Sequence, residues 1–140
     1  MDARLSADGS TACATCHDPD KGFSDQLTTS KGIHNQFGHR NAPTILNAVF
    51  NVTQFWDGRA PSLEEQAKLP PLNPIEMGQK APGDVVAKLG GIAEYRDDFQ
   101  KVFARAPDYG DMGKAIAAYE RTQVLFDTRL IASWPATARR

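Results

Sequence analysis

The sequence lacks the features that identify several common classes of protein. Its 140 residues include only two cysteines, which excludes a disulfide framework because such a framework needs several cysteines at wider spacing. No apolar run approaches the roughly 20 residues that a helix needs to span a bilayer. The formal net charge is −1, so no excess of one sign favours binding to nucleic acid or to an anionic membrane. What remains is the composition of one globular domain, 41% hydrophobic and 24% charged.

Signals of regular β-structure are also missing, since no segment alternates clearly between apolar and polar residues over the length of a strand. Residues 1–43 are rich in Gly, Ser, Asp, Asn and Thr and predict loops around one short helix that carries the cysteines. Further helices are predicted at 45–50, from Ser62 onward, at 84–89, at 93–103 and from Asp111 to about Leu125. Four prolines between 69 and 83 predict an extended, stiff loop. We therefore expect an all-α fold with long ordered loops, forming a single domain over residues 1–140.

Both cysteines fall in one five-residue motif, Cys13-Ala14-Thr15-Cys16-His17. Its C-x-x-C-H spacing is the attachment signature of a c-type haem. Two thiols on one helical turn can reach the two vinyl groups on one side of a porphyrin, and the adjacent His17 can place a ring nitrogen on the iron as the proximal ligand. We therefore predict a c-type cytochrome domain built around one covalently bound haem, with Cys13, Cys16 and His17 as its attachment residues.

Two cysteines at this spacing also serve other chemistry in proteins. A thioredoxin-like redox pair would stand in a βαβ pattern, which the surrounding sequence lacks. A zinc site needs two more ligands, and His34 and His39 are the only further histidines, so zinc stays open as an alternative. With a single haem, function depends on the sixth coordination position of the iron. A strong protein ligand there makes an electron carrier, whereas an open position lets peroxide bind and react.

An ordered series of segments beyond the haem motif resembles a known family. The segments are Arg4–Thr11, Cys13–Pro19, Arg40–Thr44, Phe55–Ala60, Leu63–Ala67, Asn73–Met77 and Ala117–Thr122. Together they resemble the N-terminal, peroxidatic haem domain of the bacterial dihaem cytochrome c peroxidases and of the related tryptophan tryptophylquinone maturation enzymes. The resemblance covers nearly the whole chain and is more specific than the haem motif alone.

The resemblance implies roles for residues outside the haem motif. Gln66, Pro70 and Glu76 correspond to residues on the distal side of the peroxidatic haem, with Glu76 as the acid–base group that moves a proton between the peroxide oxygens. Trp56 corresponds to a tryptophan between the family's two haems, and Asn41 to a ligand of calcium at the domain interface. Taken alone, these residues are ordinary: Glu76 reads as a solvated loop glutamate, Gln66 as an exposed helix residue, Trp56 as core and Asn41 as a turn residue.

The chain departs from the family pattern because it contains no second haem domain with its own C-x-x-C-H motif. The other calcium ligands come from that domain, so we do not expect this chain to bind calcium by itself. Many peroxidases of the family use a loop histidine as the sixth iron ligand. Here His34 lies one residue from the family position and is the first candidate, with His39 and Met77 as alternatives.

We predict haem-based reduction of hydrogen peroxide, with electrons from a small cytochrome, a cupredoxin or a separate second haem domain. The alternative is a mono-haem electron-transfer cytochrome without peroxidase activity, and a third is a scaffold that needs its missing half. The start Met1-Asp2-Ala3-Arg4 has no signal-peptide features. Because covalent haem attachment normally takes place outside the bacterial cytoplasm, we expect a periplasmic protein whose leader was removed or replaced.

Overall fold

Helices and loops make up the computed structural model, which describes residues 2–126. The α-helices in this range are α1 (Cys13–Cys16), α2 (Leu63–Ala67), α3 (Pro82–Gly91), α4 (Ala93–Phe103) and α5 (Tyr109–Thr122). Its 3₁₀ turns are η1 (Ala3–Leu5), η2 (Pro19–Lys21), η3 (Ile33–Asn35), η4 (Ala48–Phe50) and η5 (Pro70–Leu72). No β-strand occurs within residues 2–126, and the predicted all-α fold is confirmed. Of the helices in the same range, none combines the length and the apolar character needed to cross a bilayer.

Helix starts follow the local sequence at α2 and depart from the prediction at α5. Ser62 caps α2 as predicted, because its Oγ accepts a hydrogen bond from the backbone N–H of Glu65 at 3.2 Å. The predicted cap of α5 at Asp111 is wrong, since Asp108 accepts hydrogen bonds from backbone N–H groups of the first turn. Asp111 lies buried inside that turn instead.

The proline-rich segment between residues 69 and 83 is less extended than predicted. Pro70–Leu72 forms η5, and Pro82 is the first residue of α3. Both observations have one cause, since the fixed φ of proline, about −65°, suits the first turn of a helix although proline breaks a helix interior. The apolar segment 45–50 is likewise helical only over its last three residues, which form η4.

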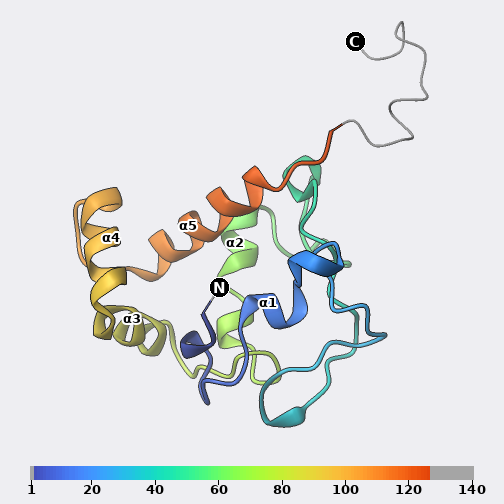
Figure 1. Ribbon diagram of the computed structural model, residues 1–140, viewed down its shortest axis with the longest axis horizontal. Coiled ribbons are helices and arrows are strands. Elements are labelled where there is room, and N and C mark those ends of the chain that lie inside the picture. The colour runs from blue at the N-terminus through green and yellow to red at the C-terminus, as the bar shows by residue number, and fades with distance from the viewer. Residues whose placement is uncertain (1, 127–140) are drawn as a thin grey trace, which may run out of the picture.

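The main apolar core lies where α3, α4 and α5 meet the segment before α3. Figure 1 shows α3 and α4 together at one end of the molecule and the long loops of residues 18–60 at the other. The buried side chains of this core are Leu5, Met77, Val85, Leu89, Phe99 and Met112. Each apolar side chain of this size contributes about 1.5–3 kcal/mol when it is buried. Met77 belongs to this core although it stands in a loop, so the loop is anchored to the helices.

A close contact between α2 and α5 holds the middle of the molecule together (Figure 1). Gly113 permits the close approach, since a Cβ atom there would lie 3.0 Å from the backbone oxygen of Glu64. Toward the end of α5, Arg121 forms an ion pair with the side chain of Glu64 at 2.7 Å. At the start of α5, the hydroxyl of Tyr109 donates to the backbone oxygen of Lys68. α2 is therefore fixed in place although it is short.

A loop of residues 31–37, which contains η3, packs against the segment that carries Glu76. The N–H of Ile33 donates to the backbone oxygens of Ile75 and Glu76, both at 3.1 Å. Gly32 is required by this packing, because a Cβ atom there would lie 1.9 Å from the backbone oxygen of Ile75. The 31–37 loop therefore braces Glu76 from the side away from the helical core.

Candidate functional site

The predicted haem-attachment residues line one large cavity. Its volume is about 510 Å³, within the range of roughly 300–1,000 Å³ that is typical of small-molecule sites. Cys13, Cys16 and His17 contribute to its wall from α1 and the residue that follows it. Much of the remaining wall comes from α2 and α5 and from the segments 38–45, 51–59 and 70–77. The fold thus brings the haem motif and the remote proline-rich segment around one space.

Both cysteines of the cavity wall are free thiols and not a disulfide. Burial raises the pKa of both, that of Cys16 to about 11, so the unreacted thiols are protonated at neutral pH. A thioredoxin-like pair differs in this respect, since its reactive thiol has a lowered pKa. The zinc alternative also lacks support, because no three His, Cys, Asp or Glu side chains within residues 2–126 are grouped to hold a metal ion. The arrangement therefore favours attachment of the two sulfurs to a porphyrin.

His17 is oriented by a backbone hydrogen bond. Its Nδ1 lies 3.3 Å from the carbonyl oxygen of Phe23. A carbonyl only accepts, so this contact selects the tautomer with the proton on Nδ1 and leaves the lone pair of Nε2 free for a metal. Burial lowers the pKa of the His17 imidazole, which favours the neutral form that a metal ligand needs. The donor set, the orientation of the imidazole and the size of the cavity fit a c-type haem.

A partly buried carboxyl group, that of Glu76, lines the same cavity from the loop after η5. Burial raises the pKa of Glu76, and the positive charge of Arg59 opposes that shift. Asn73 donates from Nδ2 to Oε1 of Glu76 at 2.8 Å. The Oδ1 of Asn73 accepts from the N–H of Ile75 at 3.0 Å, so the amide is itself fixed by the turn. The carboxyl group of Glu76 is therefore held in one position inside the cavity wall.

The other two residues that the resemblance assigns to the distal side also line this cavity. Gln66 reaches it from α2, which is fixed against α5, and Pro70 reaches it as the first residue of η5. Both come from rigid elements, so their positions relative to Glu76 are well defined. The structure thus brings together Gln66, Pro70 and Glu76 around the space that His17 faces.

Trp56 lies at the rim of the cavity and not in the core, since the residue is 61% exposed. Its Nε1 donates to the backbone oxygen of Asn41 at 3.0 Å, which fixes the indole against the neighbouring loop. Beside it, the guanidinium of Arg59 lies 3.5 Å from the centre of the Phe55 ring. The rim therefore presents one large exposed aromatic ring on a well-anchored loop.

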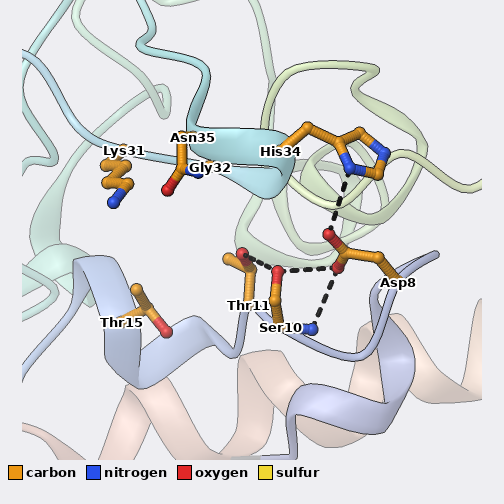
Figure 2. A pocket seen from close by; sticks show the side chains of 8 residues that line it. All are labelled: Asp8, Ser10, Thr11, Thr15, Lys31, Gly32, His34 and Asn35. Carbon is orange, nitrogen blue, oxygen red and sulfur yellow. Dashed lines mark hydrogen bonds and ion pairs between the residues drawn. The ribbon is translucent and has the colours of Figure 1, made fainter.

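The structure separates the candidates for the sixth iron ligand. His34 lies outside the haem cavity, in a smaller cavity of about 290 Å³ where its imidazole points toward Asp8 (Figure 2). The Nδ1 of His34 lies 3.5 Å from Oδ2 of Asp8, and His34 has a left-handed φ of 52°. His39 and Met77 both line the haem cavity, with Met77 also part of the buried core. The first candidate is thus not brought to the haem site, because the 31–37 loop turns its side chain toward Asp8.

Two polar residues of the cavity wall, Glu120 and Asn73, are of functional interest and were not among the predicted site residues. Glu120 lines the cavity from α5, where Met112, Ile116 and Glu120 follow one another at a spacing of four and share one helix face. An acidic residue on this otherwise apolar face was the signal that identifies it. Asn73 is the other, and its signal was its place in the turn three residues before Glu76.

Comparison with known proteins identifies the relatives of this chain. A sequence model of the family described as di-haem cytochrome c peroxidase matches residues 1–132. A cytochrome c peroxidase of Escherichia coli strain K12 is 43% identical over 127 residues, which covers 91% of this chain and 27% of that protein. The cytochrome c551 peroxidase of Pseudomonas aeruginosa is 47% identical over 131 residues, which covers 91% of this chain and 38% of that protein.

A solved structure gives the same relationship at the level of the fold. The crystal structure of a MauG-like protein associated with microbial copper homeostasis superposes with a TM-score of 0.85 and 31% identity, over 94% of this chain and 40% of that one. The chain spans less than half the length of each of these three proteins. Its fold is that of a c-type cytochrome domain, and the chain belongs to the di-haem cytochrome c peroxidase family.

Proposed function

We propose that this chain is a peroxidatic haem domain that reduces hydrogen peroxide with electrons from a redox partner. The observation that carries the proposal is that the haem-attachment residues and Glu76 line one cavity. A haem motif alone is shared with electron carriers, but a partly buried carboxyl of raised pKa in the same cavity suits acid–base chemistry. The relatives at 43% and 47% identity carry the name cytochrome c peroxidase, which supports the same reaction.

The proximal side of the site, formed by Cys13, Cys16 and His17, would hold the cofactor. One covalently bound haem c supplies the redox chemistry at its iron when it is bound. Cys13 and Cys16 would hold the porphyrin edge through thioether bonds. His17 would bind the iron through Nε2, and its hydrogen bond to the Phe23 carbonyl would keep the ring from rotating and make the imidazole a stronger donor.

The distal half of the site handles protons. Glu76 would take a proton from one peroxide oxygen and return it to the other as the O–O bond breaks. Two electrons from the redox partner and two protons from solvent then complete the reduction of one peroxide to two waters. A raised pKa moves the carboxyl group toward the working pH, which suits a group that must both take and give a proton. Asn73 holds the carboxyl during the exchange, Gln66 orients the peroxide and Pro70 shapes the wall beside it.

Electrons enter, in this proposal, through the rim at Trp56. The indole is exposed and anchored, so a partner can contact it without any rearrangement of the loop. A small cytochrome, a cupredoxin or a second haem domain meets this requirement. Calcium would bind with Asn41 only together with ligands from such a domain. We assign the reaction to the periplasm, where covalent haem attachment takes place.

A mono-haem electron carrier is the second candidate function. The observation that favours it is that His39 and Met77, both side chains able to ligate iron, line the same cavity. His34 could serve only after the 31–37 loop has moved. A permanent ligand of either kind would close the site to peroxide and leave only electron transfer.

The test is the optical spectrum of the haem-loaded chain before and after one equivalent of hydrogen peroxide. We expect a high-spin spectrum, directly or after partial reduction, that changes rapidly on mixing. Glu76→Gln should slow this change by about 10²–10⁴-fold, the range for loss of a general acid–base group. Glu65→Gln, an exposed α2 glutamate paired with Lys68, is the matched control and should react like the parent.

Each outcome of this test decides between the two functions. A low-spin spectrum that peroxide leaves unchanged, even after partial reduction, overturns the peroxidase proposal and supports the electron carrier. A peroxide reaction that Glu76→Gln does not slow overturns the role of Glu76 while leaving the activity itself standing.

A further inference from the structure

Glu120 is a buried acid that the proposed peroxide reaction does not use. It stands on the face of α5 that also carries Met112 and Ile116, and all three line the haem cavity. The residue is 8% exposed, and its Oε2 has no hydrogen-bond partner within residues 2–126. Burying a polar atom without a partner costs about 1–3 kcal/mol, more if it is charged. Packing alone therefore does not account for a carboxyl group at position 120.

The charges around Glu120 come from a small number of groups. Arg121, its neighbour on α5, lowers the pKa of Glu120, and Glu64 on α2 raises it. Arg121 forms an ion pair with Glu64 at 2.7 Å, and this pairing weakens its effect on the pKa of Glu120. The charge of Glu120 also raises the pKa of the Cys13 thiol on α1, but a thioether sulfur at that position would not titrate. The 3₁₀ turn η4, which also packs on α5, has no titratable side chain.

A further neighbour of α5 is α3, which shares the main apolar core with Met112, about two turns along α5 from Glu120. Burial therefore dominates and raises the pKa of Glu120 to about 7. Among the titratable side chains of the cavity wall, Glu76 also has a raised pKa, and Arg59 opposes its shift. The cavity wall thus contains two carboxyl groups with different surroundings: Glu76 is partly buried and held by an amide, and Glu120 is buried with no partner for Oε2 within residues 2–126.

We propose that Glu120 is a redox-linked proton site of the haem cavity. When a one-electron donor reduces the bound haem, the carboxylate of Glu120 takes up one proton from solvent and becomes the neutral acid. Reoxidation releases the same proton, so charge and protons balance in each direction. The physical cause is that an added electron makes the cavity more negative, and a buried carboxylate without a partner responds by binding a proton. The inference needs the haem but not the peroxide reaction, and it holds equally for an electron carrier.

The experiment is to measure the reduction midpoint potential of the haem-loaded chain from pH 5 to 9 by spectroelectrochemistry. We expect the potential of the parent to fall as the pH rises through the region near 7. The slope should approach a tenfold change in the reduction equilibrium constant per pH unit, which is the limit for one proton per electron. Glu120→Gln is nearly isosteric and cannot titrate, and should abolish this slope.

Two variants control for other titrating groups. Glu76→Gln removes the other cavity carboxyl and should keep the slope near pH 7. Glu65→Gln on α2 removes a carboxyl that is paired with Lys68 outside the cavity and should match the parent. A parent potential that is independent of pH overturns the proposal. A slope that survives in Glu120→Gln overturns it as well, since another group must then take up the proton.

Infrared difference spectra of the reduced and oxidised states keep the proposal testable if Glu120→Gln fails to accept haem. We expect the parent to gain the carbonyl stretch of one protonated carboxyl group on reduction. The same band in Glu76→Gln assigns it to Glu120, whereas loss of the band in that variant, or its absence in the parent, overturns the assignment. Peroxide reactivity, measured separately on the same samples, tests the proposed function independently.

Discussion

Replacing Gly32 by alanine tests whether the 31–37 loop holds Glu76 in its working position. The new Cβ atom would lie 1.9 Å from the backbone oxygen of Ile75 and 2.9 Å from the Cα of Glu76. Ordinary van der Waals contact begins at 3.4 Å, so the two segments must move apart. Neither neighbour is a flexible side-chain end, and the movement therefore has to be taken up by the backbone around Glu76.

The size of the effect follows from these contacts. Forcing an atom into a packed contact costs about 1–3 kcal/mol. Separation also breaks the hydrogen bond that the N–H of Ile33 shares between two carbonyls, which is worth about 0.5–1.5 kcal/mol. We therefore expect Gly32→Ala to lower the free energy of unfolding by about 2–4 kcal/mol. A displacement of Glu76 by about 1 Å should also slow the peroxide reaction by about 100-fold.

Two measurements check this prediction on haem-loaded protein: urea unfolding followed by circular dichroism, and stopped-flow mixing with hydrogen peroxide. Gly38→Ala is the matched control, because a Cβ atom there would lie no closer than 3.7 Å to any neighbour. We expect the control to change stability by less than about 0.5 kcal/mol. If Gly32→Ala matches the parent in both measurements, or if Gly38→Ala is equally impaired, the bracing role of this loop is wrong.

Three further predictions concern other contacts. Asn73→Ala removes a hydrogen bond that lowers the pKa of Glu76, so that pKa should rise and the acidic limb of the peroxide rate profile should move to higher pH in stopped-flow data. Gly113→Ala places a Cβ atom 3.0 Å from the backbone oxygen of Glu64 and should destabilise the α2–α5 contact by about 1–3 kcal/mol, measured as a lower thermal midpoint. The pKa of Glu120 rises from 4.5 to about 7 on folding, so the folded chain keeps a proton that the unfolded chain releases between these values. Stability should therefore fall by about 3 kcal/mol as the pH rises through this window and level off above it, and Glu120→Gln should remove the fall in urea unfolding at a series of pH values.

The sequence predicted the residues that act through local chemistry. The spacing of Cys13, Cys16 and His17 identified the haem site because one helical turn is enough to bring these groups together. The N-cap residue Ser62 located the start of α2 for the same reason. The predicted helix start was wrong where two local signals competed. At the start of α5, Asp108 and Asp111 are both suitable N-cap residues, and tertiary packing buries Asp111.

The distal side of the site depended on contacts that no local pattern contains. The resemblance named Glu76, Gln66 and Pro70, but the hydrogen bond that fixes Glu76 comes from a turn whose geometry the sequence does not specify. His34 illustrates the limit, since loop composition alone does not say which way its side chain faces. Its direction is set by the packing of Gly32 and Ile33 against a segment more than 40 residues away.

The hydrogen bond between Trp56 and residue 41 has a consequence for how much this surface can vary. The indole donates to a main-chain oxygen, which every amino acid supplies, so the orientation of Trp56 does not depend on the side chain at position 41. Asn41 is exposed, and its side chain is therefore free to change, or to serve a neighbouring domain, without disturbing the tryptophan. The backbone of residue 41 therefore holds Trp56, while its side chain is available for contacts with a partner. A mutation at position 41 can change those contacts and leave the orientation of Trp56 unaltered.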